Sequence, residues 1–367
     1  MQDTTSSTDR RTAAVEAIRR AIRAEKPYIV GSGPEPEVKL NQNESPYDLP
    51  VELKSELVER FLSIPLNRYP KEQPWALRDA LAETLGLPPD YILVGNGSNE
   101  LSHTLVLATV EPGTPVVLPR PMFSLYASVV RMHGGRPIQV APRDDFSFDV
   151  EGLHAAIRRE QPPLIILTSP NNPTGLAMPI GDIESLVAAA PGLAVVDEAY
   201  WEFNDEPPAT TLLDEHPNLV IVRTFSKAMG LAGSRIGYLI AHPDVIAELM
   251  KSRLPFMVDR FAEEIALAVL RRPELIRRQL DAIRAGRDEL ESMLDEMDGV
   301  EYVPTAANFF LFTTGADPRL LLEQMAAEGV LVRNMSGYPE LEGYLRVNAG
   351  TPAENKAFQL ALKRTLG

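Results

Sequence analysis

Six short apolar runs between residues 91 and 241 constrain the fold more than any other feature of the chain. Helix-like segments separate these runs. The runs are YILVG (91–95), PVVLP (115–119), PLIILTSP (163–170), LAVVDEAY (193–200), LVIVRTFS (219–226) and GYLIA (237–241). Several are continuously apolar rather than alternating, which is typical of strands buried on both faces of a mostly parallel sheet. The pattern predicts a three-layer α/β/α domain over roughly residues 65–260.

The C-terminal third carries a different pattern. Apolar side chains recur every three or four positions over 273–297, which predicts one long amphipathic helix. Shorter β-like and helix-like segments follow it, and their order predicts a second, smaller α+β domain. Near the N-terminus, the apolar residues of 11–25 share one helical face, and residues 38–50 are expected to form an extended arm.

Composition narrows the classes of function. The formal net charge of −15 makes the chain a poor candidate for binding nucleic-acid backbones. With no cysteine, disulfides and thiolate catalysis are excluded, and the five histidines lie at no metal-ligand spacing, so no metal site is expected. The apolar runs are too short to span a bilayer. The polar N-terminal residues do not resemble a secretory signal, so the expected location is the cytoplasm.

Polar residues follow four of the predicted strands at their carboxyl ends. Open α/β sheets bind ligands at the edge where those ends meet. GNGSNE (95–100) opens a helix whose N-terminus offers free N–H groups to a phosphate, and SPNNPTG (169–175) forms a rigid asparagine turn. Asp197 ends an apolar run, where a carboxylate is costly unless it meets a cation. Taken singly, these features also fit a plain strand-to-helix turn, an Asx-capped turn and a solvated aspartate.

The stretch TFSKAMGLAGSRIG (224–237) adds two hydroxyls, an amine and a guanidinium at one loop, which suit a phosphate group. The ordered set resembles the fold-type I pyridoxal-phosphate (PLP) aminotransferases over nearly the whole chain, and most closely the histidinol-phosphate aminotransferases. The motifs that carry the resemblance are LNQNESPY (40–47), NRYP (67–70), GNGSNE, PMFSLY (121–126), SPNNPTG, DEAY, FSKAMGLAGSRIG and VRN…YLRVNAGT.

The resemblance implies a role for each matching residue around PLP. Lys227 matches the lysine that binds PLP as a Schiff base and then moves the substrate α-proton. Asp197 matches the carboxylate paired with the pyridine nitrogen, and Arg235 the arginine that binds the cofactor phosphate. The resemblance implies three catalytic residues, which are Lys227, Asp197 and Tyr200. The remaining implied cofactor contacts are Ser98, Asn99, Thr224 and Ser226 at the phosphate, Phe123 stacked on the ring, Asn172 and Tyr200 at its 3′ oxygen, and Tyr69, which would reach the cofactor of a second subunit.

On the substrate side, Arg346 matches the arginine that clamps a carboxylate, and Arg333 the position that helps to hold the phosphate of the substrate. Tyr47 and Asn308 would line the pocket, although some relatives place this tyrosine where the chain has Ser45. Tyr126 is expected to be a packing residue. The implied reaction is transamination of L-histidinol phosphate with 2-oxoglutarate, by a homodimer acting on small molecules.

Three alternatives remain open from the sequence. An aromatic amino-acid aminotransferase shares nearly every cofactor residue, and a PLP-dependent threonine-phosphate decarboxylase uses the same scaffold. A PLP-binding sensor is the third, although residues 1–45 are too short and not basic enough for a helix-turn-helix. The expected organisation is an N-terminal helix and arm (1–64) that contributes to the small domain and a dimer contact, a PLP-binding large domain (65–265) and a C-terminal small domain (266–367).

Overall fold

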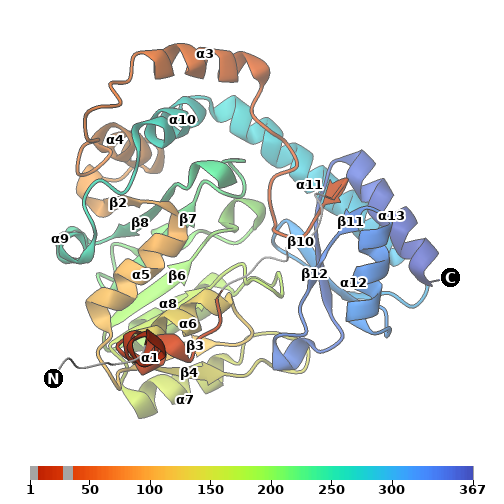
Figure 1. The fold of residues 1–367 in the computed structure, drawn as a ribbon, viewed down its shortest axis with the longest axis horizontal. Coiled ribbons are helices and arrows are strands. Elements are labelled where there is room, and N and C mark those ends of the chain that lie inside the picture. Colours follow the sequence, from red (N-terminus) through yellow and green to blue (C-terminus); the bar gives the residue numbers. More distant parts are fainter. Residues whose placement is uncertain (1–6, 28–35, 367) are drawn as a thin grey trace.

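The computed structural model describes residues 7–27 and 36–366, and its largest element is the predicted mostly parallel sheet (Figure 1). Seven strands form it in the order β2-β8-β7-β6-β5-β3-β4, and β8 runs antiparallel to both neighbours. The strands are β2 (Ile92–Gly95), β3 (Pro115–Pro119), β4 (Arg136–Val140), β5 (Leu164–Thr168), β6 (Leu193–Asp197), β7 (Leu219–Thr224) and β8 (Gly237–Ala241). The six apolar runs are confirmed as strands. Strand β4 is not among the six runs, because it is a half-exposed edge strand that contains Arg136 and Gln139.

Helices cover both faces of this sheet, so the three-layer prediction is confirmed. Alternate strand residues face opposite layers: Ile165 packs into one buried cluster and Ile166 into the other. One layer contains α4 (Trp75–Leu85), α7 (Val150–Glu160), α8 (Ile180–Ala189) and α10 (Arg260–Leu270). The other contains α5 (Gly97–Thr109), α6 (Ser124–Met132) and α9 (Pro243–Ser252).

The long helix α11 (Pro273–Asp295) leads from the large sheet to a second sheet near the C-terminus (Figure 1). That sheet has four strands in the order β12-β13-β10-β9, and its pairs are antiparallel. Its elements, with the helices that cover it, are β9 (Glu301–Val303), β10 (Phe309–Thr313), α12 (Pro318–Ala327), β12 (Arg333–Asn334), β13 (Leu345–Asn348) and α13 (Pro352–Leu366). Leu290 and Leu294 of α11 pack with Phe310 and Phe358 in a separate core.

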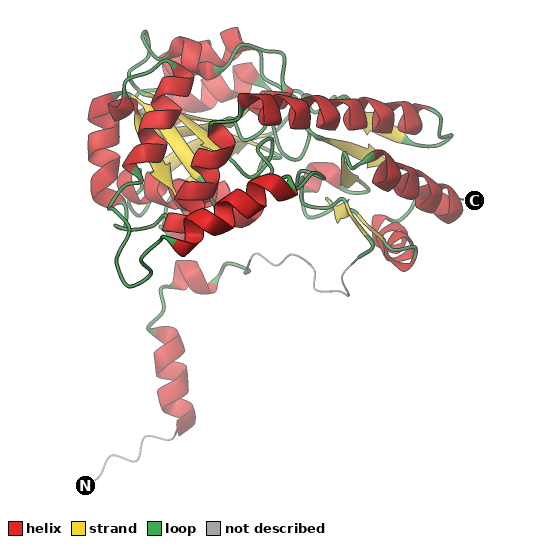
Figure 2. Ribbon diagram, turned by 90° about the horizontal axis from the view of Figure 1, so that it is seen from above, coloured by secondary structure: helices red, strands yellow, loops and turns green. Residues whose placement is uncertain are grey.

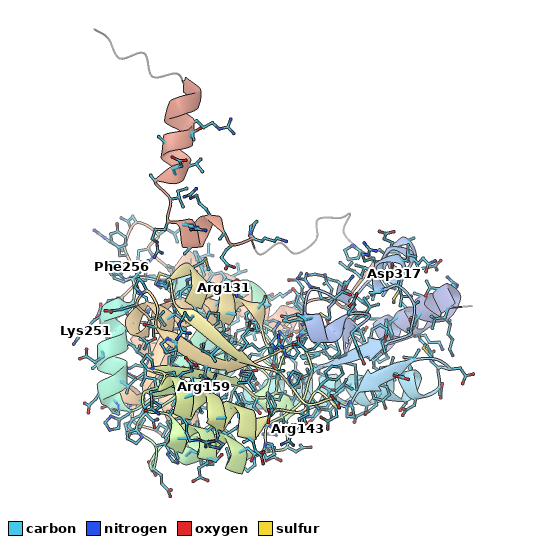
Figure 3. The ribbon with its side chains drawn as sticks, turned by 90° about the horizontal axis from the view of Figure 1, so that it is seen from below. Arg131, Arg143, Arg159, Lys251, Phe256 and Asp317 are labelled. Atoms are coloured by element: carbon cyan, nitrogen blue, oxygen red, sulfur yellow. The ribbon has the colours of Figure 1, made fainter. Side chains whose placement is uncertain are left out.

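The N-terminal segments contact both parts of the molecule. The helix predicted over 11–25 is two helices, α1 (Ser7–Glu16) and α2 (Arg20–Arg23), because the extended backbone of Arg19 separates them. Figures 2 and 3 show α1 projecting away from the body. Strand β1 (Val38–Lys39) pairs in parallel with β11 (Val330–Leu331) beside the small sheet. Helix α3 (Val51–Leu62) packs on the core of the large sheet.

Short 3₁₀ turns complete the described chain: η1 (Pro89–Tyr91), η2 (Trp201–Phe203), η3 (Ala209–Leu212), η4 (Ala232–Ser234) and η5 (Pro339–Leu341). Residues 1–6 and 28–35 of the predicted N-terminal unit, and residue 367, lie outside the described residues. None of the described helices combines the length and apolar character needed to cross a bilayer.

The small-domain core makes a testable contribution to stability. Leu290 has no exposed surface, whereas 59% of Leu320 is exposed. Leu290→Ala should lower the free energy of unfolding by about 2–5 kcal/mol, since it removes buried methyl groups and leaves a cavity. Leu320→Ala is the matched control and should stay within about 0.5 kcal/mol of the parent. Urea unfolding measures both, and equal losses would contradict the packing described for α11.

Candidate active site

The carboxyl ends of β2, β5, β6 and β7 meet at one edge of the large sheet, because these strands run in the same direction. A cavity of about 1150 Å³ opens at this edge. Its walls come from these strand ends, from residues 41–44 of the N-terminal arm, and from the small-domain segment 333–338. The structure therefore brings together side chains that are distant in sequence, and most of the predicted site residues line this one cavity.

Lys227 lies in the loop that follows β7, and its Nζ donates a hydrogen bond of 2.8 Å to the carbonyl oxygen of Gln42. The pKa of Lys227 is lowered to about 7, mainly because the amine is removed from bulk water and also because the guanidinium of Arg346 is nearby. Glu44 acts in the opposite direction. Near pH 7 a large share of this amine is thus neutral and can act as a nucleophile or a base.

Asp197 ends β6 and is buried, with 8% of its surface exposed. Its Oδ2 accepts a hydrogen bond of 2.7 Å from the hydroxyl of Tyr126, and its Oδ1 accepts one of 2.9 Å from the backbone N–H of Ala199. The pKa of this carboxyl is raised to about 6, because the effect of burial outweighs that of the two hydrogen bonds, which lower the pKa. Both donors are neutral, so a cationic group in the cavity would meet a carboxylate that is already oriented.

A polar cup lies beside Lys227. The hydroxyls of Thr224 and Ser226 are 3.0 Å apart, and Arg235 donates to Ser226 Oγ at 3.3 Å. The N-terminal turn of α5 brings Ser98 and Asn99 to the same wall of the cavity. Free N–H groups at a helix N-terminus, two hydroxyls and a guanidinium form a donor set suited to a phosphate.

The polar cup requires a glycine at position 97. Its φ is +77°, and a Cβ there would lie 2.6 Å from Nη2 of Arg235. Any side chain at this position would displace the guanidinium, in addition to the strain of the left-handed backbone. Arg235 itself has a φ of +52°, a conformation that a non-glycine residue adopts only where its surroundings enforce it.

The wall nearest the small domain carries Tyr200, Asn172 and Arg346. The hydroxyl of Tyr200 accepts a hydrogen bond of 2.9 Å from Nδ2 of Asn43. Nη1 of Arg346 donates to Oδ1 of Asn172 at 2.5 Å, and its Nη2 donates to the carbonyl of Asn41 at 2.9 Å. These bonds aim the Arg346 guanidinium at the cavity that Lys227 also lines.

Arg333 and Arg346 lie directly opposite each other on the paired strands β12 and β13. Both line the cavity. Two like charges opposite each other on an antiparallel pair repel. An anion with two negative charges, or two anionic groups, would relieve that repulsion.

Three predicted residues lie outside this cavity. Asn308 has no exposed surface, and its Nδ2 donates to the carbonyl of Asn43 at 3.3 Å, so it supports the wall from behind. Tyr47 is partly buried against the cluster that contains Tyr200 and Phe309. Tyr69 is 80% exposed, stacks on Phe256 with ring centroids 5.0 Å apart, and does not line the cavity of its own chain. Phe123 does line the cavity.

Sequence reasoning missed several residues at this site. Tyr126 was expected only to pack; it is buried as expected, but its hydroxyl also donates to Asp197. A buried tyrosine usually needs a hydrogen-bond partner, and that rule could have revealed this contact. No local pattern in the sequence indicates the roles of Gln42 and Asn43. Their partners, Lys227 and Tyr200, lie 185 and 157 residues further along the chain, so both contacts depend on how the arm docks.

The chain is similar in sequence and structure to known aminotransferases, as the site geometry would lead one to expect. The family model for aminotransferase class I and II matches residues 35–361. The chain is 41% identical over 337 residues to a histidinol-phosphate aminotransferase of Chlorobaculum tepidum, covering 92% of this chain and 97% of the relative.

Two solved structures are also similar. A histidinol-phosphate aminotransferase from Sinorhizobium meliloti in complex with pyridoxal-5′-phosphate superposes with a TM-score of 0.85, at 29% identity and with 95% of this chain and 98% of that chain covered. An L-threonine-O-3-phosphate decarboxylase from Porphyromonas gingivalis gives a TM-score of 0.78 at 26% identity, with 90% and 99% covered. The chain belongs to the class I and II aminotransferases.

Proposed function

We propose that the protein is a PLP-dependent aminotransferase that converts L-histidinol phosphate and 2-oxoglutarate to imidazole acetol phosphate and L-glutamate, a step of histidine biosynthesis. The observation that carries this proposal is the lowered pKa of the Lys227 amine, in a cavity that Arg333 and Arg346 also line. The relatives named histidinol-phosphate aminotransferase support the choice of substrate.

The residues present fit PLP. The cup of Thr224, Ser226 and Arg235 suits its phosphate, and the buried Asp197 carboxylate suits a protonated ring nitrogen. Phe123 lines the cavity where a flat ring would stack. When bound, PLP supplies an electron sink for the bond that breaks at the substrate carbon.

Lys227 would hold the cofactor and then move a proton. Its amine is held by one hydrogen bond to Gln42 and its pKa is about 7, so it can release and accept a proton near neutral pH. The resemblance assigns it transfer of the α-proton, and its place in the cavity suits that role. Tyr200, whose ring centroid lies 5.9 Å from Nζ, closes the same wall.

Asp197 and Tyr126 would set the charge on the ring nitrogen. Tyr126 orients the carboxylate by donating to Oδ2, while the raised pKa of Asp197 reflects a buried charge without a cationic donor. A protonated ring nitrogen would stabilise that charge, and the carboxylate would in turn keep the nitrogen protonated.

Arg333 and Arg346 would select the substrate. Histidinol phosphate has a phosphate and no carboxylate, whereas glutamate has carboxylates, so the two arginines must accept both anions. An arginine fork binds either group through two parallel N–H donors. An aromatic amino-acid aminotransferase is the main alternative, because it would share the cofactor residues and use Arg346 alone. Threonine-phosphate decarboxylation is a further alternative on a similar fold.

We also propose a homodimer, because seven of the exposed large apolar side chains gather in segments 51–69 and 254–256. They are Val51, Val58, Leu62, Leu66, Tyr69, Leu254 and Phe256. Figure 3 shows Phe256 at the edge of the large domain. Tyr69 within this group is the residue expected to reach the second subunit's cofactor. An apolar surface of this kind is typical of an interface.

The proposed domain division remains 1–64, 65–265 and 266–367. The two sheets with separate cores, and α11 leading from one to the other, support this division in outline. Its second boundary falls within α10, whose residues 266–270 pack in the core of the large sheet, so that core extends beyond residue 265. For its location we propose the cytoplasm, on the absence of cysteine from all 367 residues.

Replacing the amine should remove the chemistry. Lys227→Ala purified with PLP should lack the yellow absorbance of the covalently bound cofactor and lose at least about a thousandfold in kcat, because both nucleophile and proton carrier are gone. Lys251→Ala is the control, since that lysine is exposed on α9 at the outer edge of the large domain (Figure 3). A Lys227→Ala protein with the spectrum and activity of the parent would contradict the proposal.

The pH dependence of cofactor capture follows from the pKa of about 7 for Lys227. Below pH 7 the amine is protonated and unreactive, and above it the neutral form predominates. The rate at which apo-protein takes up PLP should therefore rise through pH 7 and level off. Stopped-flow absorbance measures this rate. A parallel series with free lysine whose α-amine is blocked shows how the titration of PLP itself affects the rate. A rise that continues to pH 10 would contradict the assignment.

Substrate choice can be read from one substitution. Arg333→Leu should lower kcat/KM for histidinol phosphate about 10- to 100-fold, because a charge-assisted hydrogen bond to phosphate is lost. The loss with phenylalanine should be much smaller. Arg319→Leu, at a side chain that is 79% exposed, is the matched control and should change neither. Equal losses on both substrates, or a parent enzyme that prefers phenylalanine, would favour the aromatic alternative.

A further inference from the structure

A buried ion pair lies directly behind the candidate active site. Nε and Nη2 of Arg223 approach Oε2 of Glu198 at 2.8 and 2.7 Å. Only 1% of the Arg223 side chain and 5% of the Glu198 side chain are exposed. The other carboxylate oxygen, Oε1, accepts a hydrogen bond of 2.6 Å from the backbone N–H of Ala209. Both charged groups are thus enclosed, and the hydrogen bond of the guanidinium to Glu198 is made by Nε.

The strand geometry relates this pair to the site. Glu198 follows Asp197 at the end of β6, and Arg223 precedes Thr224 on the adjacent parallel strand β7. Successive residues of a strand point to opposite faces. Asp197 and Thr224 line the cavity, whereas Glu198 and Arg223 point to its rear. The ion pair therefore joins the two strands at the level where they present the carboxylate and the phosphate cup.

The turn that carries Tyr200 rests on the same pair. The guanidinium of Arg223 lies 4.0 Å from the centre of the Trp201 ring, the residue after Tyr200. The backbone N–H of Trp201 donates to the carbonyl of Glu198 at 3.2 Å. Stacking on an aromatic face is a contact that arginine makes better than lysine. Tyr200 is consequently attached to both partners through its neighbour.

Glu202 completes the group. It is 9% exposed, and burial raises its pKa to about 8. The raised pKa favours the neutral form of Glu202, and the carboxylate that pairs with Arg223 is that of Glu198. Stability alone is a poor explanation for such a pair, because apolar residues of similar volume often replace buried ion pairs without loss.

We propose that Glu198 and Arg223 are positioning residues, which hold the ends of β6 and β7 so that Asp197, Tyr200 and the phosphate cup keep their spacing around the cofactor. This inference rests on the proposed function, since it assigns the pair a role toward the PLP site. Neither Glu198 nor Arg223 lines the cavity, so the pair would contact neither substrate nor cofactor. Its effect would reach the chemistry through Asp197, which orients the ring, and through Tyr200.

The test separates positioning from stability by removing both charges together. Glu198→Gln/Arg223→Met keeps an acceptor for Ala209 and leaves no uncompensated charge, so the holoenzyme should fold with a melting temperature within a few degrees of the parent. Arg223→Lys keeps the charge but loses the planar fork and the stack on Trp201. Glu328→Gln/Arg364→Met applies the same change to an exposed pair of the small domain and serves as control.

Three measurements are made on each folded holoenzyme: the pH midpoint of the visible absorbance of bound PLP, the affinity of the apo-protein for PLP, and kcat and KM separately. For both Arg223 variants we expect the midpoint to move by about one pH unit, a tenfold change in proton affinity, and kcat to fall about tenfold with KM within twofold. The control pair should change none of these.

Each other outcome has a defined meaning. Folded Arg223 variants with the parent midpoint, PLP affinity and kcat would overturn the inference, as would a loss confined to KM. If neither variant folds, the pair is a stability element and the inference is equally overturned. A parent protein without the visible absorbance would instead refute the proposed function itself, so the two failures are distinguishable.

Discussion

The structure depends on one constraint: the large sheet is covered by helices on both faces, so charged groups can reach solvent or a ligand only at its edges. Three strands that end at the same edge bring Thr168, Asp197 and Thr224 to one cavity. Burial behind that edge then lowers the pKa of Lys227 and raises that of Asp197. The reactivity of the site is thus a consequence of the same layering that stabilises the domain.

The cavity joins groups of opposite electrical character. The lining residues include the cations Lys227, Arg235, Arg333 and Arg346, and the acid Asp197. In a chain with a net charge of −15, this local positive group is what can attract an anionic substrate. The small domain supplies Arg333 and Arg346, whereas the large domain supplies Lys227 and Asp197. The relative placement of the two sheets therefore determines how far the amine lies from the arginines.

Much of this could be predicted from the sequence, and the reasons for success and failure are physical. Continuous apolar runs identified six buried strands, whereas β4, with Arg136 and Gln139, has the polar character of an exposed edge.

The site residues Lys227, Asp197 and Arg235 follow strands or loops whose positions the apolar pattern sets. The placement of Asn308 behind the wall, and the contacts of Gln42 and Asn43, depend on long-range docking of the arm, which no local pattern encodes. Arg19 divides the first helix through a backbone change that the apolar spacing did not reveal.

The docking of the arm also bears on the order in which the site can assemble during synthesis. Strand β1 pairs with β11, the backbone N–H of Asn348 donates to the carbonyl of Leu40, and Arg346 donates to the carbonyl of Asn41. The segment that holds the Lys227 amine is therefore held by residues translated some 300 positions later. A ribosome-bound chain that has completed only the large sheet would have Gln42 but not the later residues that hold it beside the amine. Its cavity would also lack the wall formed by Arg333 and Arg346.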